Sequence, residues 1–218
     1  MLRNQNGSEL WRLIVVGGLS PNIGRAQLVC DIIQAFPKVN WIAGRFAEAA
    51  GDPCALTWET QTNSGTAASL FLAAGASRSF ELRANRDSLA DCLRVLRRTL
   101  SDSLSAAADS RKMAVVIESD LQMQFLKPSL YFAVIDPDNE DFSEASQVAL
   151  ESANALVLRA TAPVDPNQPP APLWMKVPPK LLQQRPSVLQ TQGELLARPL
   201  ESLIHQMLDD PPSVEFSS

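Results

Sequence analysis

Short apolar runs alternate with amphipathic segments from residue 13 to residue 158 of the chain. Most of the runs have the length and composition of a strand buried on both faces. Residues 77–83 instead alternate between apolar and polar side chains, as a half-buried strand does. The predicted strands are residues 13–16, 39–46, 77–83, 113–117, 130–135 and 155–158.

The segments between these strands show helical periodicity. Residues 25–36 carry apolar side chains at helical spacing and are followed by Pro37, which ends a helix. From Leu89 onward, a single apolar stripe follows a cap at Asp87 and Ser88. Strands that alternate with helices predict an α/β domain with a mostly parallel sheet. Further helices are predicted at residues 67–76 and 142–151.

Two segments interrupt this alternation. Residues 48–64 are polar and are predicted to form a long loop. Residues 162–180 contain seven prolines, a density that predicts an extended linker. An amphipathic helix follows at residues 192–208, with Pro199 as an interruption. The predicted organisation is a domain at residues 1–161, a proline-rich linker at residues 162–191, and a C-terminal helix with a frayed end at residues 192–218.

Composition narrows the classes of function. The 218 residues are 45% hydrophobic and 20% charged, which is ordinary for a globular protein, and the net charge is −5. The chain has no basic block, which argues against nucleic acid and anionic lipid as partners. No apolar segment has the length of a membrane span or the flanks of a signal peptide, so the expected location is the cytoplasm.

The three cysteines are widely spaced and form no Cys-x-x-Cys pair. We therefore expect neither a disulfide framework nor a metal site built on them. Cys30 and Cys92 lie on predicted apolar helix faces and are expected to be buried thiols. Cys54 lies in the predicted long loop and is expected to be the exposed and most reactive thiol.

The segment VVGGLSPNIGRA, residues 15–26, combines the parts of a phosphate-binding loop. Gly18 and Gly24 let the backbone curl around an anion, and the helix predicted from Arg25 would direct its positive end toward the phosphates. The same glycines would also suit a tight strand-to-helix turn that binds nothing. The predicted phosphate-binding residues are Gly18, Asn22, Ile23, Gly24, Arg25 and Ala26.

Five residues separate Gly18 from Gly24, where the usual pattern has four. This longer loop resembles the dethiobiotin-synthetase and nitrogenase-iron-protein branch of P-loop proteins, whose run is similar to G-x-x-x-x-V-G-K-T. It also resembles the loops of a bacterial P-loop group, similar to G-G-x-x-x-N-I-G-K-T. The resemblance implies a three-layer P-loop NTPase-like fold, with GTP or ATP as ligand. The residues that match the second pattern are Gly17, Gly18, Asn22, Ile23 and Gly24.

Two later segments resemble the molybdopterin-guanine dinucleotide biosynthesis adaptors, which are small GTP-binding P-loop proteins. SGTAASLFLAAGASRSF, residues 64–80, is similar to their G-K-D-[ST]-x-x-x-x-x-A-G-A segment, with Gly65 at the position of the glycine. MAVVIE, residues 113–118, resembles their apolar strand that ends in an acidic residue near the metal. The resemblance therefore makes Glu118 the candidate metal ligand.

The departures from these patterns fall on the polar residues. Arg25 stands where the family has the lysine that reaches the β- and γ-phosphates, and Ala26 stands where it has the hydroxyl residue that binds Mg²⁺. In the second segment, the acidic and hydroxyl residues of the family fall on Ala67 and Ala68. A methyl group cannot ligate a metal, so the usual Mg²⁺ site is not expected. These losses favour a degenerate P-loop protein that binds nucleotide or phosphate with weak or no hydrolysis.

The expected role is that of a non-catalytic subunit or adaptor, in a homodimer or heterodimer or with another protein partner, rather than that of an enzyme. Two alternatives remain open. One is an active GTPase or ATPase that uses Arg25 and takes its metal ligands from Glu118, Asp120 or Asp136. The other is a purely structural subunit without a ligand. The sole histidine, His205, lies on the predicted C-terminal helix and indicates no catalytic triad.

Overall fold

The structure is a computed structural model, and it describes residues 12–18, 24–48, 54–85, 87–106, 113–119, 128–136, 147, 150–160, 177–191 and 194–210. Within these ranges, eight strands form one sheet in the order β3-β4-β2-β5-β1-β6-β7-β8. Each pairing between these strands is parallel except that of β3 with β4. The strands are β1 (Leu13–Gly18), β2 (Asn40–Glu48), β3 (Cys54–Glu59), β4 (Arg78–Ala84), β5 (Met113–Ser119), β6 (Leu130–Ile135), β7 (Ala155–Ala160) and β8 (Ser187–Thr191).

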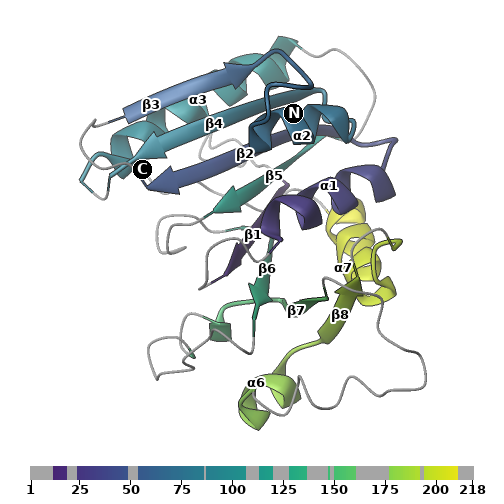
Figure 1. The fold of residues 1–218 in the computed structure, drawn as a ribbon. Coiled ribbons are helices and arrows are strands. Elements are labelled where there is room, and N and C mark those ends of the chain that lie inside the picture. The colour runs from purple at the N-terminus through teal and green to yellow at the C-terminus, as the bar shows by residue number, and fades with distance from the viewer. Residues whose placement is uncertain are drawn as a thin grey trace.

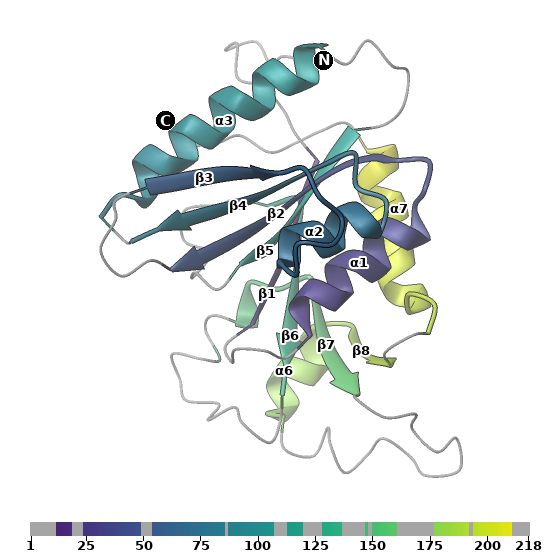
Figure 2. The same ribbon diagram turned by 45° about the horizontal axis from the view of Figure 1, so that its top comes forward.

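Helices cover both faces of the sheet and complete a three-layer α/β fold (Figure 1). One face carries the helices α1, α2 and α7, and the other carries α3, as the turned view shows (Figure 2). The short helix α6 packs with the α3 face through Leu181. The helices are α1 (Arg25–Ala35), α2 (Ala67–Ala73), α3 (Leu89–Ala106), α6 (Pro179–Gln184) and α7 (Arg198–Asp209).

The central strands explain why the apolar runs predicted this architecture. In β1, Leu13 and Val15 pack into the core on the α3 face, and Ile14 and Val16 pack into the core on the α1 face. All four side chains are fully buried. A strand covered by helices on both sides needs apolar residues at every position, and this confirms the predicted α/β class with its mostly parallel sheet.

The loop predicted at residues 48–64 is wrong in its middle, because residues 54–59 form β3, whereas residues 60–64 are neither helix nor strand. This edge strand runs antiparallel to β4 and places Leu56 opposite Leu82 and Trp58 opposite Phe80. Only one of its faces meets the core, so its sequence, CALTWE, alternates weakly instead of forming an apolar run. Residues 49–53 lie outside the described residues.

The linker predicted at residues 162–191 is corrected for its described part. Pro179 occupies the first turn of α6, where a proline has no backbone donor to lose. Residues 187–191 then form β8, which pairs in parallel with β7 and sets Val188 opposite Val157. Residues 161–176 lie outside the described residues, as does most of the helix predicted at 142–151.

The C-terminal helix also differs from its prediction. It begins at Arg198, with Pro199 in its first turn, so the proline starts the helix instead of interrupting it. Leu200 and Ile204 are fully buried in the core shared with α1. Arg12 donates from its guanidinium to the backbone oxygens of Met207 and Asp210, which fastens the end of α7 beside the start of β1. The tail helix therefore docks on its own sheet.

A disulfide joins Cys54 at the start of β3 to Cys92 of α3, with 5.7 Å between their Cα atoms. The prediction of two separate thiols at these positions is wrong. Cys92 does face the core as predicted, whereas Cys54 belongs to the edge strand β3 and not to a loop. Spacing along the chain gave no sign of this proximity, because β3 itself was not predicted. Cys30 is a buried thiol, as expected, and its Sγ donates to the backbone oxygen of Leu70 at 3.7 Å.

Candidate functional site

The segment predicted to bind phosphate lies between a central strand and a helix. β1 ends at Gly18, and α1 begins at Arg25 directly after Gly24. Gly24 is the N-cap of the helix in a left-handed conformation, with φ at 81°, which a residue with a Cβ adopts only at a cost. Its carbonyl accepts the first helical hydrogen bond, from Leu28 N at 3.0 Å. The predicted residues Asn22 and Ile23 lie outside the described residues.

As in any helix, the N–H groups of the first turn of α1 have no intrahelical acceptor, and together they carry the partial positive charge of a helix N-terminus. The N-cap residue is a glycine, so it offers these groups no side-chain acceptor. This end of α1 lies at the carboxyl edge of the parallel sheet, which is the edge where ligands bind in open α/β sheets.

Arg25 does not point away from the protein. The residue is only 5% exposed, and its Nη1 donates to the backbone oxygen of Ser119 at 3.0 Å. Its Nε lies 3.8 Å from Oε1 of Glu118, which is also buried. The fold thus brings together two predicted site residues, one from the first turn of α1 and one from the end of β5. Sequence reasoning assigned them separate ligands, a phosphate and a metal, and did not predict their ion pair.

The residues present do not fit a Mg²⁺ ion at the usual place. Ala26 offers a methyl group that packs against the core on the α1 face, where a hydroxyl ligand would be needed. Glu118, the candidate metal ligand, faces the guanidinium of Arg25 instead. Within the described ranges, no three His, Cys, Asp or Glu side chains gather closely enough to hold a metal ion. The donor set at this edge suits an anion better than a divalent cation.

Sequence reasoning missed a second arginine at the same edge. Arg45 of β2 is the register partner of Glu118 on β5, so the two residues lie side by side on adjacent strands. Its Nε atom is buried. The signal was present in the sequence, because Arg45 is a charged residue near the carboxyl end of a predicted buried strand, but an isolated arginine was not weighed as a site residue.

Those of the remaining predicted residues that the structure describes do not gather into a second site. Asp136 follows β6 at the same edge of the sheet and is half-buried, whereas Asp120 lies outside the described residues. The ring of His205 packs edge-on against Phe36, with 4.9 Å between the ring centroids. His205 therefore has a packing contact on α7.

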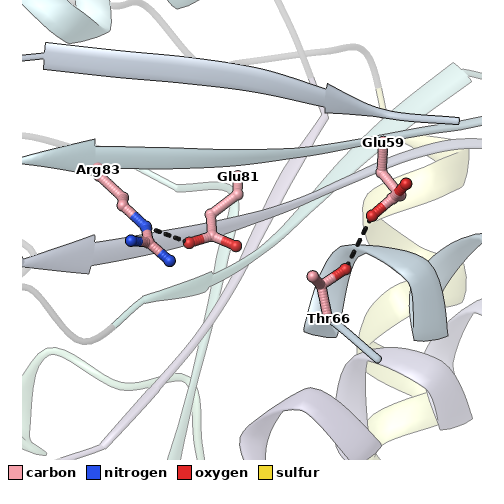
Figure 3. A network of polar contacts seen from close by, with 4 residues as sticks. All are labelled: Glu59, Thr66, Glu81 and Arg83. Atoms are coloured by element: carbon pink, nitrogen blue, oxygen red, sulfur yellow. Dashed lines mark hydrogen bonds and ion pairs between the residues drawn. The ribbon is translucent and has the colours of Figure 1, made fainter. Parts of the chain in front are cut away.

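The second predicted motif forms the start of α2. Gly65 has φ at 79°, and Thr66 caps the helix by accepting from Ser69 N at 3.0 Å. Thr66 also donates from its hydroxyl to Glu59 at the end of β3, at 2.9 Å (Figure 3). Ser64 donates to the same carboxylate oxygen at 2.6 Å. Ala67 and Ala68 occupy the first turn of α2, and this motif serves to join the helix to the edge strand.

The hydrogen bonds around Glu59 hold the pKa of its carboxyl down to about 2, from an ordinary value of 4.5. The largest contribution comes from the Ser64 hydroxyl, followed by the backbone N–H of Gln61 and the hydroxyl of Thr66. Figure 3 also shows Glu81 and Arg83 of the neighbouring strand β4, which pair with each other at 2.5 Å. The carboxylate of Glu59 thus accepts its hydrogen bonds from neighbouring residues of the same loop, Ser64, Thr66 and Gln61.

Comparison with known proteins establishes the fold. No protein-family model and no curated protein matches this sequence. Among solved structures, the fold is similar to that of HypB from Helicobacter pylori, whose crystal structure is a complex with nickel. The TM-score is 0.51 at 12% sequence identity, over 89% of this chain and 83% of that one. The chain therefore has a P-loop NTPase-like α/β fold. Among the described helices, none is long and apolar enough to cross a membrane.

Proposed function

We propose that this chain binds a phosphate-bearing ligand, in the first place a nucleotide, at the N-terminus of α1, and that it hydrolyses the ligand weakly or not at all. The observation that carries the proposal is the placement of Gly24 and Arg25. A left-handed glycine opens a helix at the carboxyl edge of a parallel sheet, and a buried arginine follows it at once. The P-loop NTPase-like fold supports the same location.

Binding relies on groups that remain after the loss of the family's polar residues. The backbone N–H groups of the first turn of α1 can donate to phosphate oxygens, and the helix dipole favours their negative charge. The guanidinium of Arg25 adds a donor fork whose geometry matches a phosphate. None of these interactions requires the side chain at position 26, which is alanine in this chain.

Weak hydrolysis follows from the residues that are replaced. In P-loop NTPases, Mg²⁺ bridges the β- and γ-phosphates and neutralises the charge that develops during transfer. Ala26 cannot hold that ion, and Glu118 is engaged with Arg25. A ligand can therefore be bound in the ground state without the stabilisation of the transition state that turnover needs.

Calorimetric titration with GTP, ATP, GDP and ADP tests this function, each with Mg²⁺ and with EDTA. We expect saturable binding of at least one nucleotide, and no metal-dependent release of phosphate above the rate of a control without protein. An Arg25→Gln variant should weaken the binding, because glutamine has neither the charge nor the guanidinium donors. The matched control is Arg198→Gln, which changes an exposed arginine at the same position of α7. Metal-dependent turnover at ordinary enzymatic rates would contradict the proposal.

The role that fits such a site is that of a non-catalytic subunit or adaptor, in the manner of the molybdopterin-guanine dinucleotide biosynthesis adaptors that residues 64–80 and 113–118 resemble. The nickel reported for HypB is not part of this proposal, because the described residues offer no group of three suitable ligands. Light scattering after gel filtration, with and without nucleotide, tests whether the chain forms a dimer as such an adaptor would. A monomer in both conditions would contradict a role as a homodimeric adaptor.

A further inference from the structure

We infer that the site takes its phosphate ligand without a divalent metal ion, because Arg25 and Arg45 supply the positive charge and share Glu118 as their counter-ion. This inference rests on the proposed function and names the electrostatic means by which it would work. It also assigns a binding role to Arg45, which lies in none of the motifs described above.

The sheet register sets the three charged residues close together. Glu118 of β5 lies between Val16 of β1 and Arg45 of β2 in one row across the sheet. Alternate residues of a strand share a face, and Ala43, two positions before Arg45, packs into the core on the α1 face. Arg45 therefore stands on the side of the sheet that carries α1 and its first residue.

Arg25 reaches the same carboxylate from the helix. Its Nε lies 3.8 Å from Oε1 of Glu118, and its Nη1 donates to the neighbouring backbone oxygen of Ser119. Glu118 thus has one arginine above it on α1 and another beside it on β2. A buried carboxylate keeps its charge only with such compensation, and two guanidinium groups around one carboxylate leave positive charge for an anion.

A divalent cation is disfavoured in this arrangement. It would have to share the carboxylate of Glu118 with Arg25, and it would lie beside two guanidinium groups that repel it. A phosphate group has the opposite preference, since it can take Arg25 from Glu118 by offering a bidentate acceptor. Arg45 then remains beside Glu118 and keeps that carboxylate compensated. Asp136 follows β6, which is separated from β5 and its Glu118 by β1.

This arrangement makes Glu118 a competitor of the ligand. Removing its charge frees Arg25 for the phosphate, so Glu118→Gln should bind more tightly than the wild type. Removing the charge of Arg45 obliges Arg25 to remain with Glu118, so Arg45→Gln should bind more weakly. A metal ligand at position 118 would have the reverse effect, because the glutamine variant would then lose affinity and its dependence on Mg²⁺.

The test is calorimetric titration of the full chain with pyrophosphate and with GDP, at constant ionic strength, in EDTA and in excess Mg²⁺. We expect the wild-type affinity in EDTA to be within about threefold of that in Mg²⁺, Arg45→Gln to weaken binding by about tenfold, and Glu118→Gln to strengthen it severalfold. Arg83→Gln is the control, since Arg83 is an exposed arginine on β4 that pairs with Glu81. Circular dichroism establishes that each variant is folded.

The outcomes distinguish a failure of the proposed function from a failure of the metal-free site. If the wild type binds neither pyrophosphate nor GDP in either buffer, and none of the other nucleotides titrated above, the proposed function is wrong. If it binds only with Mg²⁺, or if Glu118→Gln abolishes binding, the proposed function stands and the metal-free site is overturned. If Arg45→Gln does not fold, the metal dependence of the wild type and the affinity of Glu118→Gln still decide the question.

Discussion

The centre and the β3 edge of the sheet are fastened in different ways. At the centre, β1 and β5 are buried on both faces. The buried charged residues there are Arg25 and Glu118, which form an ion pair. At the edge, β3 has a neighbour on one side only, and side chains hold it. The links of that edge are the Cys54–Cys92 disulfide, the stacking of Arg78 on Trp58 at 4.0 Å, and the hydrogen bonds of Glu59.

This difference separates stability from binding within one molecule. Apolar burial from two sides keeps central strands in place without specific side-chain links, so the carboxyl edge of the centre is available for a charged site. An edge strand loses half of that support and depends on individual bonds. Changes at the β3 edge should therefore alter the free energy of unfolding, and changes at Arg25, Arg45 or Glu118 should alter ligand affinity.

The largest effect is expected from the disulfide. Cys54→Ser removes a crosslink between residues separated by 38 positions and should lower the free energy of unfolding by about 2–4 kcal/mol. Thermal unfolding of the variant and of the wild type, each with and without a dithiol reductant, measures this. The reductant should lower the melting temperature of the wild type alone. Equal melting temperatures for all four samples would show that the edge does not depend on this bond.

A smaller effect is expected where the centre meets the edge. A Cβ at Gly44 of β2 would lie 2.2 Å from Cζ of Phe80 on β4, so Gly44→Ala should destabilise the protein by about 1–3 kcal/mol. Combining it with Phe80→Leu removes the clash, and the double variant should be more stable than the two single losses summed. Denaturant titrations of the three variants measure this coupling, and simple additivity would contradict the packing described.

The cap of α2 should contribute about 1 kcal/mol, which Thr66→Ala removes. The same change deprives Glu59 of a donor, so it weakens the join between β3 and α2 as well as the helix. Thr66→Ser keeps the hydroxyl and is the matched control. Denaturant titration should give the serine variant nearly wild-type stability, and an equal loss in both variants would assign the effect to the lost methyl group.

The smallest effect is a dependence on pH. The pKa of Glu59 is held at about 2, below its ordinary 4.5, so its hydrogen bonds stabilise the folded edge fully above pH 4.5. This stabilisation disappears as the pH falls from 4.5 toward 2, because the carboxyl is then protonated. An NMR titration of the side-chain carboxyl carbon should show a midpoint near 2, which Ser64→Ala raises and Ser187→Ala does not. An unchanged midpoint in Ser64→Ala would contradict the assigned cause.

The difference between central and edge strands also explains which parts of the fold could be predicted from the sequence. The central strands were predicted because a strand buried on both faces is a run of apolar residues, as in residues 13–16. β3 was missed because only one of its faces meets the core and its alternation is therefore weak. β8 packs Val188 and Leu189 on opposite faces, but this short apolar pair follows a proline-rich segment and was interpreted as part of a linker. The disulfide could not be predicted once β3 was read as a loop.

The candidate site was predicted in parts. Gly24 and Arg25 were predicted as phosphate-binding residues from the local pattern of strand, glycine and helix. Glu118 was predicted as a metal ligand, because its strand end resembles that of a known family. Their contact depends on β5 lying next to β1 in the sheet, which no local pattern records. Arg45 was missed for the same reason, since only the register of β2 with β5 places it beside Glu118.

The central claim is that the start of α1 exchanges Glu118 for a phosphate. A crystal structure of the chain with GDP in the absence of divalent metal tests it most directly. The account predicts the β-phosphate within hydrogen-bond distance of the first-turn amides of α1 and of the Arg25 guanidinium. It also predicts that Arg25 no longer makes the 3.0 Å hydrogen bond that its Nη1 now donates to the Ser119 oxygen. A diphosphate bound elsewhere, or an Arg25 still bonded to Ser119 beside a bound nucleotide, would contradict it.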